Sequence, residues 1–331
     1  MLPQRCGIAS RPLLGLRHIL LCHSPCKASL VPSAYALAKR RNTLVVSRHI
    51  LKMQFIKEIL ESPEFGEKYP ELVYHKEAVI AAISGVFEYI GDRKEAVRER
   101  FLLKPYDFLW EIHVLQILLK QGKRLVKSET KGPDIIIQED TNRIVIECVS
   151  PADWNPKPRG PGFSYTFHEK EKIYRYSSSI KDKIDKILTY KEKEIILDSD
   201  ISIIAVSGGM QDFGGVFVHL PDIFKAVYPY GQHIYSIPLS SPEESTVEFE
   251  NRGNVKHPSG SGAELVTDYF CRDEFAIISG ILFNPLNILS DSEFDGNGFH
   301  YVHNRQATNP LSTGYLKRVK EYIGECPKYG D

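Results

Sequence analysis

Hydrophobic residues recur along the chain with two different periods. From Met53 onward, and again at 78–90 and 108–120, they stand three and four positions apart, which predicts amphipathic helices. Gly91 and Gly122 follow two of these stretches, and glycine commonly ends a helix. The same spacing predicts further helices at 169–194, 220–227 and 312–323.

Short runs rich in Ile and Val predict β-strands. The runs at 135–138 and 143–148 are joined by a few polar residues, which is typical of a hairpin. The run at 201–206 is fully apolar, as expected of a strand buried on both faces. The predicted strands are 125–128, 135–138, 143–148, 201–206, 275–283 and 298–303.

Two stretches rich in turn-forming residues predict loops, at 152–163 and 240–262. The order of helices, strand hairpin, crossover helix and further strand indicates an α/β fold, with a central mixed β-sheet flanked by helices. We divide the chain into a basic leader at 1–52, a helical segment at 53–104, a core at 105–206 and a C-terminal extension at 207–331.

Charge is distributed unevenly over the 331 residues. The whole chain has no net charge, but ten Lys and Arg and no acidic residue precede Glu58. The remainder therefore carries about −10, which argues against broad electrostatic binding of nucleic acid and favours a local site. The leader resembles a mitochondrial presequence. We place ahead of this an upstream extension before a start at Met53, and therefore predict a cytoplasmic protein, with a mitochondrial one as the alternative if the leader is genuine.

Two further features limit the environment of the protein. The most apolar early stretch, 13–22, is interrupted by Arg17 and His18, so we expect no membrane-spanning helix. The six cysteines include no C-x-x-C pair, which predicts a reducing compartment and no disulfide framework.

Two carboxylates stand at matching places in the predicted hairpin. Asp134 comes just before the first strand and Glu147 lies near the end of the second. Carboxylates on neighbouring strands can share a divalent cation, because Mg²⁺ takes hard oxygen ligands and keeps several waters. Such a cation can activate water and neutralise charge on a phosphate. We therefore expect Mg²⁺ or Mn²⁺ at this hairpin.

Two predicted helices carry a charged residue on a face that is otherwise apolar. Glu111 falls on the dry side of the helix at 108–120, and Lys183 interrupts the apolar stripe of the helix at 169–194. A buried carboxylate is costly unless it is paired, protonated or bound to metal, so Glu111 needs a partner. The solvent face of the first helix is predicted to contain His113, Gln116 and Lys120.

Taken together, the helix Glu111, the Gly-Pro-Asp134 turn and the strand with Glu147 resemble the PD-(D/E)xK nuclease superfamily, in the order α, β, β, β, α, β. The resemblance covers about 105–206 and implies a restriction-endonuclease-like core. It also implies that Glu111, Asp134 and Glu147 hold Mg²⁺ or Mn²⁺. The chain departs from the family at Val149, where the family has a lysine. Some members supply this lysine from a neighbouring helix, which implies that Lys183 assists the attacking water.

The predicted substrate contacts are basic residues near this site. Lys157 and Arg159 lie with Trp154 in the loop at 152–163, and charge combined with stacking is how single strands are held. We add Arg175, on the helix that carries Lys183. The implied partner is nucleic acid, with no membrane contact and no oligomeric state predicted.

Three interpretations of these residues remain open at this stage. The first is a metal-dependent nuclease acting on DNA or RNA. The second is a catalytically inactive nuclease-like domain that serves as a binding or assembly module. The third is a buried ion pair between Glu111 and Lys183, because proteins also keep such pairs without catalytic purpose.

Overall fold

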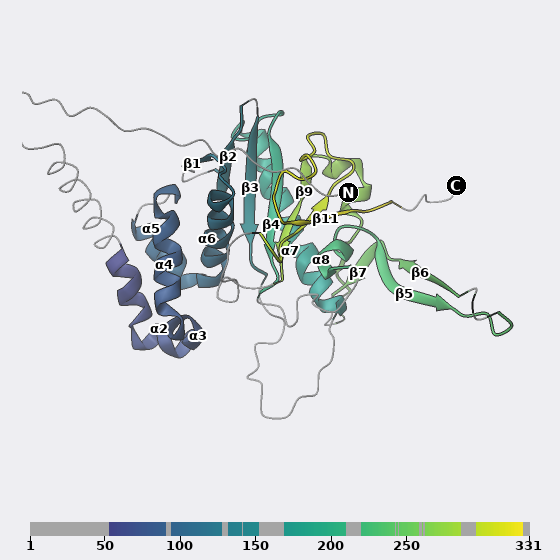
Figure 1. The fold of residues 1–331 in the computed structure, drawn as a ribbon, viewed down its shortest axis with the longest axis horizontal. Coiled ribbons are helices and arrows are strands. Elements are labelled where there is room, and N and C mark those ends of the chain that lie inside the picture. The colour runs from purple at the N-terminus through teal and green to yellow at the C-terminus, as the bar shows by residue number, and fades with distance from the viewer. Residues whose placement is uncertain are drawn as a thin grey trace, which may run out of the picture. The chain divides into compact units, whose positions relative to one another are not determined.

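A seven-stranded mixed β-sheet is the central layer of the computed structural model (Figure 1). Its strands lie in the order β1-β2-β3-β4-β9-β10-β11. The pairs β1–β2, β2–β3 and β9–β10 are antiparallel, whereas β3–β4, β4–β9 and β10–β11 are parallel. The strands are β1 (Leu125–Val126), β2 (Ile135–Gln138), β3 (Arg143–Val149), β4 (Ile201–Ser207), β9 (Ile278–Asn284), β10 (His300–His303) and β11 (Lys320–Ile323).

The chain divides into two units, Met1–Arg48 and His49–Asp331, and every residue that the structure describes lies in the second. The described residues are 53–90, 94–127, 132–140, 142–151, 169–209, 220–241, 243, 245–257, 260, 262–285 and 296–326. The predicted basic leader at 1–52 and the predicted loop at 152–163 lie outside them.

Helices cover both faces of the sheet (Figure 1). On one face, α6 packs against β3 and is itself covered by α4 and α5, whereas α7 packs against β3 and β4 on the other face. Residues 53–60 are also helical. The helices are α2 (Pro63–Lys68), α3 (Pro70–Tyr74), α4 (Lys76–Val86), α5 (Lys94–Leu103), α6 (Pro105–Lys120), α7 (Glu169–Glu192) and α8 (Asp222–Lys225), with 3₁₀ turns at Phe87–Tyr89, Tyr269–Cys271 and Asp273–Phe275.

Alternate residues of β3 enter two different cores, because successive side chains of a strand point to opposite faces. Ile144, Ile146 and Cys148 belong to the core on the α6 side. Val145 belongs to the core on the α7 side, and Glu147 has the same orientation as Val145. The predicted α/β class, with a mixed sheet and flanking helices, is confirmed.

Two small antiparallel sheets lie outside the central one: β5 (Tyr230–Ser236) with β6 (Thr246–Asn251), and β7 (Asn254–Lys256) with β8 (Glu264–Val266). The β5–β6 hairpin projects away from the central sheet (Figure 1). The predicted loop at 240–262 is therefore wrong in part, because β6 and β7 fall within it. The alternation from Thr246 to Glu250 forms a strand once β5 supplies backbone partners.

The predicted C-terminal helix at 312–323 is also wrong. Its last residues form β11, an edge strand parallel to β10. Gly314 and Arg318 have φ angles of 76° and 60°, and a right-handed helix cannot pass through such residues. Strand β10 then provides hydrogen-bond partners for the backbone of Lys320–Ile323.

The predicted solvent face of the helix at 108–120 is wrong at His113, which is fully buried. Its ring packs edge-on against Trp110 and Phe299, with centroids 5.7 and 5.1 Å apart. Phe299 precedes β10 in the sequence, so only the folded sheet brings it to this helix. Phe108, Ile112 and Leu115 are buried as predicted.

The cysteine prediction needs one correction. Cys271 and Cys326 form a disulfide with 5.4 Å between their Cα atoms. The two are 55 residues apart in sequence, and their approach follows from the position of β11 at the sheet edge. Cys148 is a free, buried thiol. Within the described residues, no helix combines the length and the apolar character needed to cross a membrane.

Candidate functional site

Asp134 and Glu147 face each other across the antiparallel strands β2 and β3. Ile135 pairs with Ile146, so the next positions outward in this register are Asp134 and Glu147. Asp134 is fixed by its own strand pair, because its Oδ2 accepts a hydrogen bond of 2.8 Å from the backbone N–H of Cys148. The side chain of Glu147 is 1% exposed, whereas that of Asp134 is 20% exposed.

Two lysines from α7 meet these carboxylates. The Nζ of Lys183 lies 2.8 Å from Glu147 Oε2 and 3.5 Å from Asp134 Oδ2. The Nζ of Lys186 lies 2.7 Å from the same Glu147 Oε2 and 3.9 Å from Asp134 Oδ1. Residues three apart share one helix face, so the two ammonium groups arrive together. We call these four residues the acid–lysine cluster.

Helix α7 is positioned by an apolar stripe that flanks the two lysines. Tyr176, Ile180, Ile184 and Ile187 are all buried against the sheet. Tyr190, one turn after Lys186, donates a hydrogen bond of 2.9 Å from its hydroxyl to the backbone carbonyl of Gly132. The helix is thereby tied to the turn that precedes Asp134.

Burial and charge oppose each other in the acid–lysine cluster. Burial alone would raise the pKa of the Asp134 carboxyl, but Lys183, Lys186 and the N–H of Cys148 outweigh it and hold this pKa below its ordinary value. Burial, followed by the charge of Asp134, raises the pKa of Glu147 despite the two ammonium groups. Burial acts to lower the pKa of each lysine, yet the carboxylates hold both above the ordinary value.

Glu147 has one oxygen that the lysines leave untouched. Both ammonium groups contact Oε2, and among the described residues no hydrogen-bond partner reaches the buried Oε1. A buried carboxylate oxygen without a partner is costly, and it is a suitable ligand for a hard cation. Asp134 and Glu147 are therefore the residues that would hold the predicted Mg²⁺ or Mn²⁺ ion, whose other ligands would come from water and phosphate.

A third protein ligand is not assembled in the same way. Among the described residues, no three His, Cys, Asp or Glu side chains form a group that could hold a metal ion. Glu111 is buried on α6, as the helical wheel predicts, and its Oε2 forms an ion pair with Arg100 of α5. Lys183 pairs with Glu147 and Asp134. Each member of the ion pair considered between Glu111 and Lys183 thus has another partner in the structure. The role of Glu111 as a metal ligand stays a prediction.

A recess of about 440 Å³ opens beside the acid–lysine cluster. It lies between the α5–α6 corner and α7, and both Asp134 and Lys183 line it. Arg100 and Asp107 are among the lining residues that the sequence pattern did not predict. The recess is lined by Glu99, Arg100, Leu103, Lys104, Asp107, Glu111, Asp134, Cys148, Val149, Ser179, Asp182 and Lys183.

Asp107 adds a further carboxyl group to this recess. Its Oδ1 accepts a hydrogen bond of 3.0 Å from the backbone N–H of Ser150, just after β3. Burial raises the pKa of this carboxyl, against the lowering effects of the Ser150 N–H and of Lys104. Its position in the first turn of α6 resembles an ordinary capping residue, so the sequence contained no signal for it. For Lys186 the sequence did contain a signal, because this lysine stands three residues after Lys183 and so shares a helix face with it.

The predicted substrate contacts are described only in part. Lys157 and Arg159 lie outside the described residues. Arg175 is half-buried on α7, two turns before Lys183. Their roles in substrate binding stay predictions.

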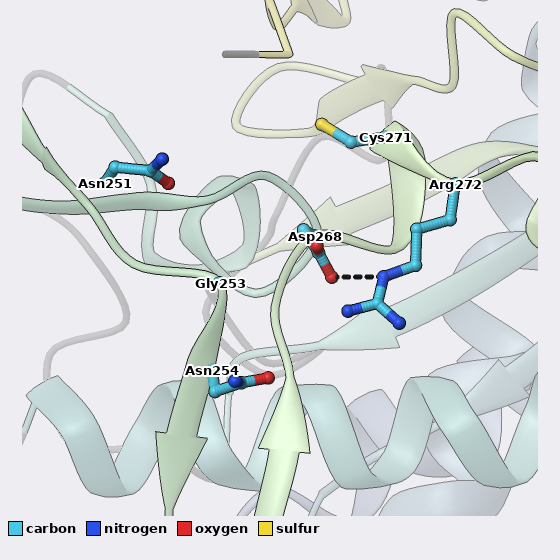
Figure 2. Close-up of a pocket in the computed structure, with 6 residues that line it drawn as sticks. All are labelled: Asn251, Gly253, Asn254, Asp268, Cys271 and Arg272. Carbon is cyan, nitrogen blue, oxygen red and sulfur yellow. Dashed lines mark hydrogen bonds and ion pairs between the residues drawn. The ribbon is translucent and has the colours of Figure 1, made fainter. Parts of the chain in front are cut away.

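A second recess, of about 540 Å³, lies away from these residues, where β6 leads into β7. Figure 2 shows Asn251 and Asn254 on either side of Gly253, and Arg272 facing Asp268. Arg272 Nε lies 2.7 Å from Asp268 Oδ1, so this pair is internally neutralised. Cys271, which forms the disulfide, completes the lining.

In comparisons with known proteins, no protein-family model, no curated protein and no solved structure matches the chain.

Proposed function

We propose that this chain is a metal-dependent phosphodiesterase of the PD-(D/E)xK type that hydrolyses DNA or RNA. The observation that carries the proposal is the approach of the Lys183 ammonium to Asp134 and Glu147, at 3.5 and 2.8 Å. Lys183 on α7 would thus substitute for the lysine that is absent at Val149, as in members of the superfamily with a relocated lysine. The order α6, β1, β2, β3, α7, β4 supports a restriction-endonuclease-like core.

Asp134 and Glu147 would hold Mg²⁺ or Mn²⁺, with Glu111 as the predicted third ligand. When bound, the ion makes water a nucleophile near neutral pH and offsets charge on the phosphate. Asp134 is held for this task by the Cys148 N–H, and Glu147 by its two lysines.

Lys183 would act on the phosphate and on the attacking water. Its ammonium lines the recess and donates hydrogen bonds, so it can stabilise negative charge on a phosphate oxygen. Lys157, Arg159 and Arg175 would contact the neighbouring phosphates of the strand. The recess supplies room for one phosphate and its sugar beside the carboxylates.

The direct test uses the full chain with labelled single- and double-stranded DNA and RNA, in Mg²⁺ and in Mn²⁺. We expect cleavage in the presence of either ion, reduced at least ~100-fold in Glu147→Gln and in Lys183→Met. Glu147→Gln keeps the shape of the side chain and removes its charge. The matched control is Lys181→Met on the exposed side of α7, where Lys181 pairs with Asp185.

Two results would contradict the proposal. One is cleavage that persists at the same rate in both variants, which would assign the activity to a contaminant or to another site. The other is the complete absence of cleavage for every substrate in either ion, with the wild-type chain folded and monodisperse.

A specific observation favours a second candidate function, the inactive nuclease-like module. Within the described part of the chain the metal-binding group of three is missing, and two lysines already neutralise the two carboxylates. Such a domain would bind nucleic acid without cutting it. Fluorescence anisotropy with the same substrates in Mg²⁺ and in Mn²⁺ distinguishes the two, because binding that is not followed by cleavage in the presence of the ion supports the module.

A further inference from the structure

The acid–lysine cluster balances its own charge. Asp134 and Glu147 contribute two negative charges, and Lys183 and Lys186 contribute two positive charges within 4 Å of them. Glu147 is buried on α7's side of the sheet, where an unpaired carboxylate would be strongly disfavoured. The lysines therefore act as counter-ions that are part of the chain itself.

The two lysines differ in what else they touch. Lys183 lines the recess, with its side chain 17% exposed. Lys186 lies outside the set of residues that line the recess, and its Nζ is 5.4 Å from the centre of the Tyr190 ring. A ligand that enters the recess thus contacts Lys183, whereas the ammonium group of Lys186 lies over the Tyr190 ring in a cation–π contact.

A divalent cation that approaches this arrangement gains little. Its attraction to two carboxylates is offset by repulsion from two ammonium groups at similar distances. Such an ion would bind well once one ammonium had moved to another anion. A phosphate diester in the recess supplies that anion, because lysine binds phosphate as a point charge.

We propose that Lys183 and Lys186 hold Asp134 and Glu147 closed to a divalent cation until a phosphate diester draws Lys183 away, so that the cation and the diester bind together. This inference rests on the proposed function and deepens it by naming how the site is controlled. Lys186 stays on Glu147 throughout and prevents a fully uncompensated buried charge. The Oε1 atom of Glu147 is buried and has no hydrogen-bond partner among the described residues, and it would accept the cation once Lys183 has moved.

Binding of Mn²⁺, followed by electron paramagnetic resonance of the free ion, tests the inference without any need for catalysis. The full chain is titrated with Mn²⁺ alone and with saturating dimethyl phosphate, a diester that resists hydrolysis and carries no base. A titration without protein corrects for direct contact between the ion and the diester. In the wild type we expect the diester to tighten Mn²⁺ binding at least ~5-fold.

Removal of either lysine separates the counter-ion effect from a merely structural one. Lys183→Met should bind Mn²⁺ alone at least ~10-fold more tightly than the wild type, with less than ~2-fold further gain from the diester. Lys186→Met should likewise bind Mn²⁺ more tightly, and it replaces the more exposed of the two side chains, at 38%. Lys181→Met, with the same loss of charge on the exposed side of the helix, should behave like the wild type.

The outcomes decide the inference independently of the activity. If the diester leaves Mn²⁺ affinity unchanged in the wild type, the inference is wrong, even where the chain cleaves nucleic acid. If the linkage is found and no cleavage occurs, the inference stands and the proposed function fails. Should Lys183→Met not fold, as judged by circular dichroism, the wild-type linkage and the Lys186→Met titration decide the question.

Discussion

The hydroxyl of Tyr190 donates a hydrogen bond of 2.9 Å to the backbone carbonyl of Gly132, 58 residues earlier in the chain. This bond joins the end of α7 to the turn that carries Asp134. It thereby couples the helix that supplies both lysines to one of the two carboxylates. The position of the two lysines relative to Asp134 thus depends on Tyr190, which is not itself part of the acid–lysine cluster.

Replacement of Tyr190 by Phe should loosen this link. We expect Tyr190→Phe to lower the free energy of unfolding by about 1 kcal/mol, because the Gly132 carbonyl loses its donor. Urea denaturation measures the change, with Tyr74→Phe as the control, since Tyr74 is 84% exposed. An equal stability of the two variants would show that the bond does not hold α7 in place.

Packing of α7 against the sheet should depend on its buried stripe. Ile184→Ala removes a side chain that is 1% exposed and should cost about 2–5 kcal/mol of stability. Leu188→Ala, one turn further along, is the matched control, because Leu188 is 38% exposed and should cost less than about 1 kcal/mol. Chemical denaturation of both variants checks the difference, and similar losses would place the buried face of α7 elsewhere.

The disulfide between Cys271 and Cys326 should stabilise the edge of the sheet. It closes a loop of 55 residues, so its loss should cost about 4 kcal/mol, mainly through greater freedom of the unfolded chain. Thermal unfolding with and without a thiol reductant measures the effect. The double variant Cys271→Ser with Cys326→Ser should have the stability of the reduced wild type, and the reductant should not change it. Insensitivity of the wild type to reductant would contradict the link.

Stability should fall in mild acid because of His300. Burial, assisted by the charge of Lys320, lowers the pKa of His300 from 6.5 to about 4. Between these values the unfolded chain binds a proton that the folded chain does not, so stability decreases as pH falls from about 6.5 to about 4. Since the ring is partly exposed, we expect a loss of roughly 1–2 kcal/mol.

The measurement is the free energy of unfolding at several pH values for the wild type and for His300→Gln. The variant should lose the part of the slope that His300 causes, so the difference in stability between the two proteins should change by roughly 1–2 kcal/mol as pH falls from about 6.5 to about 4. Parallel curves across this range would show that His300 titrates alike in both states.

Several parts of the site were predictable from local pattern. Asp134 and Glu147 sit in a hairpin with a short turn, so their opposition follows once the register of β2 and β3 is known. Lys183 interrupts an apolar helical stripe, and the inward face of that helix was therefore predictable. Glu111 likewise falls on the apolar side of its own predicted helix, and it is buried.

The partners of these residues were not predictable. Arg100 reaches Glu111 from another helix, and Asp107 enters the recess because β3 ends beside the start of α6. The helical period places His113 on the solvent face, but in the folded protein Phe299 packs against its ring. The helical spacing at 312–323 gave way to a strand, because the open edge of β10 offers backbone partners that a short helix lacks.

The sequence by itself determined the α/β class, the period of each main element and the inward or outward side of most residues, because these depend on spacing within one segment. Tertiary structure alone decided which distant side chains meet: two lysines on one oxygen of Glu147, Arg100 on Glu111, and Cys271 with Cys326. The physical reason is range. Periodicity acts over a few residues, whereas ion pairs and sheet edges join segments whose approach is set by burial of the whole core.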